Sequence, residues 1–308
     1  MNHVITLPPA WVDSIQLDQA LLGRGGPHDL GIHSVTFNIP NGCKIMVDAG
    51  IRLLSLANQI NSTTRRVILN FAEGPAGTMG YLNRMGFFDH LAKEVEVYPA
   101  RPAYSGAAVY RGNNKELVEF AAINPNHRDQ ELPDRLSKAV AAALHKRNDV
   151  NSIEEAIWTV FAELIDNIFS HSATTLDGYA AMQVYKNGNI LQVAVCDSGH
   201  GIMQTLRPTI ETQFPRLISL SDIDLLVEVF RQGISRHGPD QGCGLKGSAQ
   251  KAMKYNADLE VRLPQCRVDL KPANGFYEAN TALCYENLPL VWGTHIAFKF
   301  YLDGAPQF

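Results

Sequence analysis

The sequence lacks several features that would assign a chain to a class of protein at once. Its five cysteines among 308 residues are scattered and never spaced as Cys-x-x-Cys, which argues against a zinc site and against a disulfide framework. They indicate free thiols in a reducing compartment. There is no run of about 18 apolar residues and no basic start followed by an apolar segment. We therefore expect a cytoplasmic protein without a membrane span or a signal peptide.

A strong charge of either sign is also missing. The formal net charge is −4, with 19% charged residues, so bulk charge does not indicate nucleic-acid binding through phosphate neutralisation. A chain of this length that is 45% hydrophobic can form two ordinary globular domains. The stretch 124–133, rich in Asn, Pro and charge, predicts a boundary between a first domain at 1–125 and a second at 126–308.

In the first domain, segments of strand length alternate with segments of helical periodicity. Strands are predicted at 34–38, 44–48, 65–71 and 95–98, and helices at 51–60 and 81–91. This order predicts a small α/β domain, a sheet covered by helices. The segment Leu69 to Leu91 resembles the STAS-like domains that precede ATP-binding domains in some bacterial regulators. Such domains often carry a phosphorylatable serine where this chain has Thr78, and an α/β interaction domain of another type is the alternative.

The second domain contains an amphipathic segment from Ser152 to His171. Its apolar residues recur at helical spacing, and Ser152 with Glu155 three residues later forms a capping-box pattern. Glu163, Asn167 and His171 are four residues apart and so lie along one side of the predicted helix. Taken alone, three such residues are most simply interpreted as a solvated helix face. The motifs that follow change that interpretation.

Two strand-like runs, at 179–186 and 190–196, flank Asn187-Gly188-Asn189, which predicts a hairpin because Asn-Gly accepts the positive φ of a tight turn. The second run ends directly at Asp197-Ser198-Gly199-His200-Gly201-Ile202. The two glycines let the backbone fold tightly, so the carboxylate can face the bottom of a pocket. A plain turn explains an isolated motif of this kind equally well. A calcium loop is excluded, because Pro208 occupies the position of its final glutamate.

A glycine-rich segment follows a helix predicted at 222–232. It contains Gly242, Gly244 and Gly247 and leads into a helix predicted at 247–255, an arrangement typical of phosphate sites. The three glycines spell G-x-G-x-x-G, but a loop precedes them instead of a strand, which argues against a Rossmann site, and no P-loop motif is present. Near the C-terminus, residues 292–301 alternate as a half-buried strand does, with Gly293-Thr294 at its start.

The order of these motifs is more specific than any one of them. E-x-x-x-N on a helix, D-x-G-x-G after a strand, a flexible lid ending in G-x-G-L, and G-T opening a late strand closely resemble the GHKL superfamily of ATP-binding domains. That superfamily includes DNA gyrase, histidine kinases, the mismatch-repair ATPase and anti-sigma-factor kinases. The resemblance covers about residues 152–301. It implies a Bergerat-type two-layer α/β sandwich, with a mixed sheet and helices on one face, and ATP and Mg²⁺ as cofactors.

The resemblance also implies a role for each matching residue. Asn167 would hold the Mg²⁺ that bridges the phosphates, Glu163 would act as general base, and Asp197 would accept a hydrogen bond from the adenine amino group. The other implied ATP-binding residues are Gly199, Gly201 and Ile202 beside the base, Gly242, Gly244, Leu245 and Lys246 in the phosphate-side lid, and Thr294 near the adenine. His171 matches a position that varies within the superfamily, so its role stays open.

Two functions remain as alternatives. The first is hydrolysis of Mg-ATP, or transfer of its γ-phosphoryl group to a regulatory partner protein by a histidine-kinase-like or anti-sigma-factor-kinase-like enzyme with Glu163 as base. The second is an ATP-gated interaction module with little or no turnover, in which nucleotide orders the lid at 235–247. We expect neither the transducer domain of gyrase-like enzymes nor the dimerisation helices of histidine kinases. The partner and the oligomeric state, a homodimer included, stay open.

Overall fold

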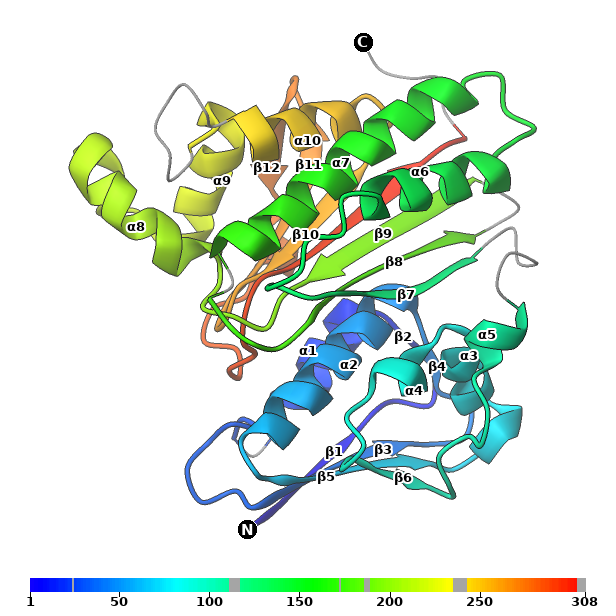
Figure 1. Ribbon diagram of the computed structural model, residues 1–308. Coiled ribbons are helices and arrows are strands. Elements are labelled where there is room, and N and C mark those ends of the chain that lie inside the picture. Colours follow the sequence, from blue (N-terminus) through cyan, green and yellow to red (C-terminus); the bar gives the residue numbers. More distant parts are fainter. Residues whose placement is uncertain (24, 111–116, 172, 186–188, 235–242, 304–308) are drawn as a thin grey trace.

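The computed structural model describes residues 1–308 except 24, 111–116, 172, 186–188, 235–242 and 304–308. The described chain forms an α/β structure of alternating helical and sheet layers (Figure 1). A layer of helices covers a seven-stranded sheet, and further helices lie between that sheet and one of four strands. None of the helices that the structure describes combines the length and apolar character needed to cross a membrane.

The four-stranded sheet is built from the N-terminal part of the chain and is parallel throughout. Its order is β1 (Asn2–Thr6), β3 (Ser34–Ile39), β5 (Arg66–Phe71) and β6 (Glu96–Tyr98). β2 (Trp11–Val12) and β4 (Lys44–Ile45) form a separate parallel pair. The predictions of β3, β5 and β6 are confirmed, whereas β1 was missed and only the first two residues of the strand predicted at 44–48 are extended.

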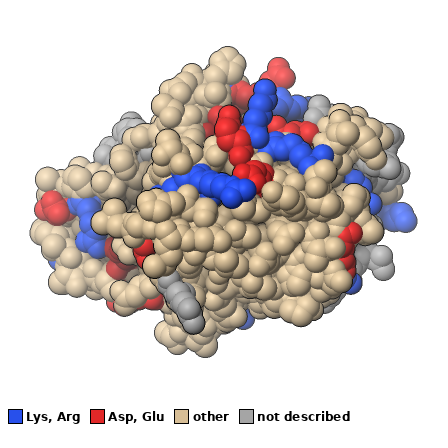
Figure 2. Space-filling model, turned by 90° about the horizontal axis from the view of Figure 1, so that it is seen from below, with Lys and Arg blue, Asp and Glu red and all other residues tan. Residues whose placement is uncertain are grey.

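The outer side of this sheet carries the polar residues Thr36, Asn38 and Asn70 and the exposed Val4. No helix from the described ranges covers it, although parallel sheets are usually covered on both faces. Figure 2 shows the molecule from this side, and large parts of the face are uncharged.

Helices on the inner side of the four-stranded sheet connect its strands. They are α1 (Ser14–Leu21), α2 (Val47–Ser62), α3 (Thr78–Arg84), α4 (Phe87–His90) and α5 (Gly106–Tyr110), with a 3₁₀ turn at Gly74–Ala76. Nearly every residue of α2 is buried, because it lies between the two sheets. The helix predicted at 81–91 is two short helices, since Gly86 adopts φ of 80° between them.

The seven-stranded sheet is antiparallel at every pairing between described strands. Its order is β12 (Phe276–Ala279), β11 (Arg267–Ala273), β10 (Asp258–Arg262), β13 (His295–Tyr301), β9 (Ile190–Cys196), β8 (Gly178–Tyr185) and β7 (Leu117–Ile123). The expectation of a mixed sheet is therefore wrong, and α2, from the N-terminal part of the chain, packs against one face of this sheet. β7 precedes residue 125, so this sheet draws strands from both sides of the predicted boundary, which itself stays a prediction.

The outer helices are α6 (Leu132–Ala143), α7 (Val150–His171), α8 (Ile202–Gln213), α9 (Asp222–Gln232) and α10 (Cys243–Met253), with 3₁₀ turns at Pro215–Leu217 and Thr281–Leu283. The predicted helix 222–232 is confirmed and ends at Gly233, whose φ is 75°. α7 starts before Ser152, so the predicted capping box there is wrong. Ile153, Ile157 and Val160 of α7 are buried in the apolar core over the sheet.

Candidate functional site

A small cavity lies where β9 ends and β13 begins, beneath the C-terminal half of α7. Asn167, Asp197, Ile202 and Thr294 line it together with apolar residues of α7, β9 and β13. The four named residues come from four separate segments: α7, the loop after β9, the start of α8 and the loop before β13. The fold therefore brings together the asparagine, aspartate and threonine that the sequence motifs singled out.

Asp197 is the most constrained polar group of the site. Its side chain is buried and its two carboxylate oxygens accept hydrogen bonds from the backbone N–H groups of Gly199 (2.7 Å) and Thr294 (2.9 Å). Burial raises the pKa of Asp197 to about 6, because loss of solvation outweighs these hydrogen bonds. A carboxylate oxygen has two lone pairs, so each can accept one further donor.

Thr294 joins the two loops of the cavity. Its hydroxyl oxygen accepts the N–H of Ile202 at 2.8 Å, and its carbonyl accepts the N–H of Asp197 at 3.0 Å. The preceding Gly293 has φ of 86°, and a Cβ there would lie 2.1 Å from the Asp197 carbonyl oxygen. Only glycine fits that position. Sequence reasoning noted Gly293 as the start of a strand and missed this role, although its place directly before Thr294 was the available signal.

Asn167 and Glu163 project from successive turns of α7. The side-chain nitrogen of Asn167 is buried and has no hydrogen-bond partner within the described chain, so this amide has an unused polar group at the cavity. Glu163 is half-buried, and its pKa is raised by burial and, to a lesser degree, by the neighbouring charge of Asp166. A raised pKa makes this carboxylate a stronger base than an ordinary glutamate, which is suited to accepting a proton.

The start of α10 lies directly against Glu163. A Cβ on Gly244 would be 2.1 Å from the carboxylate oxygen Oε2 of Glu163, so the carboxylate occupies the N-terminal turn of α10, where the helix dipole favours an anion. Leu245 is buried in the core, and Lys246 forms no ion pair with any residue whose position is described. Gly242 lies outside the described residues.

Three of the site residues predicted from the sequence remain to be placed in the fold. Gly199 and Gly201 lie in the loop between β9 and α8, and Gly201 has φ of 82°. His171 is the last residue of α7, and its side chain lies outside the described part of the chain.

The size of the cavity limits what it admits in this conformation. Its volume of about 20 Å³ is room for about one water molecule. A planar base can enter only if lining side chains such as Leu164, Ile202 and Ile296 move apart. In the described ranges no three His, Cys, Asp or Glu residues are grouped to hold a metal ion. Mg²⁺ held by one or two protein oxygens plus phosphates needs no such group.

A second set of site residues comes from α2, behind the cavity. The side-chain amide of Gln59 donates to Ser198 Oγ (3.2 Å) and to the Trp292 carbonyl (3.1 Å), and its oxygen accepts the Trp292 N–H at 2.9 Å. Ser55 Oγ is 2.9 Å from Ser198 Oγ. Gln59 therefore ties together the residue after Asp197 and the residue before Gly293. Sequence reasoning missed it, because only the apolar pattern of its helix was visible.

No protein-family model matches this sequence, and no match was found among curated proteins. Any functional assignment therefore depends on the residues of the chain itself.

Proposed function

We propose that this chain is an ATP-binding protein of the GHKL superfamily, with a Bergerat-type nucleotide site in its C-terminal part and a STAS-like regulatory part before it. One observation carries the proposal: Asn167, Asp197 and Thr294, which the motif order selects, line the same cavity. These residues come from segments far apart in the sequence, so their meeting in one cavity supports the proposal.

At the adenine end, the Asp197 carboxylate would accept a hydrogen bond from the base. Two backbone N–H groups already fix its orientation, so little freedom is lost on binding. A buried carboxylate attracts an amino group and repels a carbonyl oxygen in the same place, which would select adenine over guanine or hypoxanthine. Ile202 would pack beside the base, and Gly199 and Gly201 would allow its close approach.

At the phosphate end, the polar side of α7 faces the start of α10. Asn167 would hold Mg²⁺ through its amide oxygen, and its unpartnered amide nitrogen would donate a hydrogen bond to a phosphate oxygen. Bound Mg²⁺ would neutralise charge on the phosphates. Lys246 and the N-terminal turn of α10, with Gly244 and Leu245, would lie beside the phosphates. Glu163 would accept the proton of a water molecule or of a protein hydroxyl.

The second candidate function, an ATP-gated interaction module, is favoured by the contact between Glu163 and Gly244. Phosphates at the N-terminus of α10 would meet the Glu163 carboxylate in that position. Nucleotide binding would therefore shift either the carboxylate or the start of α10. Such a shift is itself a signal that a partner protein can recognise, without any turnover.

The two candidates are separated by following the fate of Mg-ATP. Purified full-length protein is incubated with labelled Mg-ATP, and binding, phosphate release and protein labelling are measured for the wild type, Glu163→Ala and Glu155→Ala. Glu155 lies on the same helix but is exposed and pairs with Lys251, so it serves as the control. Turnover that only Glu163→Ala abolishes supports the enzyme. Binding without turnover supports the module, and absence of ATP binding refutes both.

A further inference from the structure

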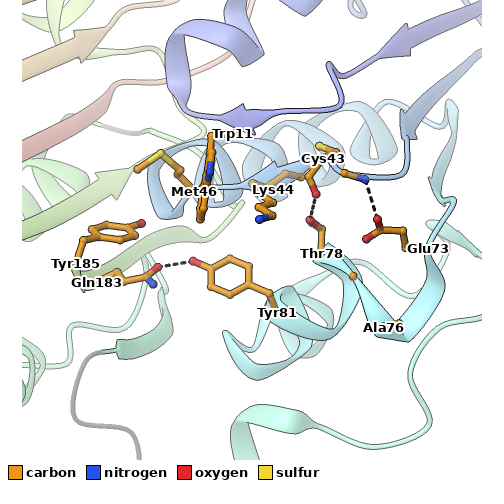
Figure 3. A pocket seen from close by; sticks show the side chains of 13 residues that line it. Trp11, Cys43, Lys44, Met46, Glu73, Ala76, Thr78, Tyr81, Gln183 and Tyr185 are labelled. Carbon is orange, nitrogen blue, oxygen red and sulfur yellow. Dashed lines mark hydrogen bonds between the residues drawn. The ribbon is translucent and has the colours of Figure 1, made fainter. Parts of the chain in front are cut away.

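A second cavity, of about 440 Å³, lies at the carboxyl edge of the four-stranded parallel sheet (Figure 3). The segments after β3 and β5 supply Lys44 and Glu73, and β8 of the other sheet supplies Gln183 and Tyr185. Open α/β sheets bind ligands at this edge. The volume lies within the range of small-molecule sites.

Aromatic side chains from three different segments form its walls. Trp11 is 61% exposed. Tyr81 donates to Gln183 Oε1 at 2.6 Å, and the Tyr185 hydroxyl accepts the Val47 N–H at 3.4 Å. These two hydrogen bonds fix the hydroxyl end of each tyrosine ring. Figure 3 shows the three rings around one space, so a planar aromatic ligand would find ring surface on more than one side.

The charges around this cavity favour an anion. The Lys44 ammonium lies 5.1 Å from the centre of the Trp11 ring and forms no ion pair with any described residue. Glu73 is the other charged lining residue, but its Oε1 accepts the Gly42 N–H at 2.7 Å and its Oε2 lies against Gly77. Its charge is therefore held by the loop backbone.

The start of α2 adds to this preference. Its N-cap residue, Met46, lines the cavity and provides no side-chain cap, so the positive end of a 16-residue helix lies beside the cavity. Asp48 in the first turn is buried, and one of its oxygens accepts the Ser14 N–H. Burial raises the pKa of Asp48, which favours its neutral form.

We propose that this cavity binds a small planar aromatic anion, such as an aromatic carboxylate, with its ring against Trp11 and Tyr81 and its acid group at Lys44. The proposal concerns a different site from that of Asp197 and does not depend on nucleotide binding.

The test is calorimetric titration of the full-length wild type with three probes of similar shape: indole-3-acetate, the neutral indole-3-acetamide and the cationic tryptamine. We expect the affinity to fall in the order indole-3-acetate, indole-3-acetamide, tryptamine. The first two should differ about tenfold in Kd, as one charge-assisted hydrogen bond provides. Lys44→Gln should remove the preference for acetate over acetamide. Trp11→Ala should weaken the binding of both indole-3-acetate and indole-3-acetamide.

Two controls make the outcome specific. Trp158→Ala removes another exposed tryptophan, on α7, and Asp197→Ala alters the other cavity; both should bind indole-3-acetate as the wild type does. Lys44 and Trp11 are exposed, so their variants should fold, which the thermal midpoint checks. Absence of indole-3-acetate binding at millimolar concentration, equal affinity for all three probes, or affinity that Trp11→Ala leaves unchanged would overturn the proposal.

Discussion

The two faces of the seven-stranded sheet are held by different forces. The face toward α7 and α10, which we call the outer face, is apolar, with buried residues such as Val193, Leu259 and Phe298. The face toward α1 and α2, the inner face, carries buried charges on β10 and β11, among them Glu260 and Arg262. Apolar burial is tolerant of small changes in shape, whereas buried charges must be paired.

The inner-face charges connect the N-terminal helices to the sheet. Arg52 of α2 pairs with Asp18 of α1 (2.8 Å) and with Glu260 of β10 (2.5 Å). Arg262 pairs with Asp18 at 3.1 Å, and Arg267 with Glu260 at 3.4 Å. Because the cluster crosses from helices to sheet, it fixes how the two parts of the chain meet. The comparison teaches that apolar packing holds the outer face, whereas paired buried charges on the inner face must keep both partners in place.

Removal of a buried charge from the inner face should have the largest effect on the free energy of unfolding. Glu260→Ala leaves Arg52 and Arg267 without their shared carboxylate, and we expect a loss of about 3–5 kcal/mol of unfolding free energy. Urea unfolding measures it. The matched control is Glu96→Ala, which breaks the exposed pair with Arg66 and should lose at most about 1 kcal/mol. Equal losses for both variants would contradict the distinction between buried and exposed pairs.

Acid should weaken the inner face through the same carboxylate. Burial by itself would raise the pKa of Glu260, but the guanidinium groups of Arg267 and Arg52 outweigh it and lower the pKa to about 2. The ionised form is therefore stabilised in the folded state. Its contribution, about 3 kcal/mol, is complete above the ordinary pKa of about 4.5 and is lost as pH falls toward 2. The unfolding free energies of the wild type and of Glu260→Gln should therefore converge as pH falls across that interval. A difference between them that stays constant with pH would contradict this expectation.

Gln59 should show an intermediate effect, because it links the inner face to the candidate nucleotide site. Gln59→Leu leaves the Trp292 N–H without its acceptor, which should lower the unfolding free energy by about 1–3 kcal/mol. If the proposed function is right, affinity for Mg-ATP should fall as well. Gln19→Leu, at an exposed position of α1, is the control for both measurements. Unchanged stability would show that the bonds of Gln59 are not needed.

A conservative substitution on the outer face should have the smallest effect on the free energy of unfolding. Ile157→Val removes one buried methyl group from α7 and should lower the unfolding free energy by about 0.5–1.5 kcal/mol, independent of pH. Ile218→Val, at a partly exposed position, should be almost neutral. A loss as large as that of Glu260→Ala would remove the contrast between the faces.

The same contrast explains how much of the fold the sequence could predict. β9 and α9 were predicted within a residue or two, since their apolar patterns and turn residues are local signals. β10 and β11 were missed, because charged residues interrupt their apolar pattern. The reason is physical: Glu260 and Arg262 each pair with a residue more than 200 positions earlier in the chain, Arg52 and Asp18 respectively.

The candidate site likewise contains some features that local motifs could predict and others that they could not. Asp197 and Thr294 could be selected from motifs, because Asp197 opens the loop that contains Gly201 and Thr294 follows Gly293, and both glycines have positive φ. The closed volume of the cavity, the contact between Glu163 and Gly244, and the role of Gln59 could not be predicted, because each depends on packing between distant segments.

The most direct test of the central proposal is the base selectivity of Asp197. Calorimetric titration at pH 7.5 compares Mg-ATP with Mg-ITP, in which a carbonyl replaces the adenine amino group. The wild type should bind ATP at least about tenfold more tightly, as a hydrogen bond to a charged group provides, and the preference should shrink below about pH 6 as Asp197 gains a proton. Asp197→Ala should lose the preference. Equal binding of ATP and ITP by the wild type, or binding of neither, would contradict the assignment.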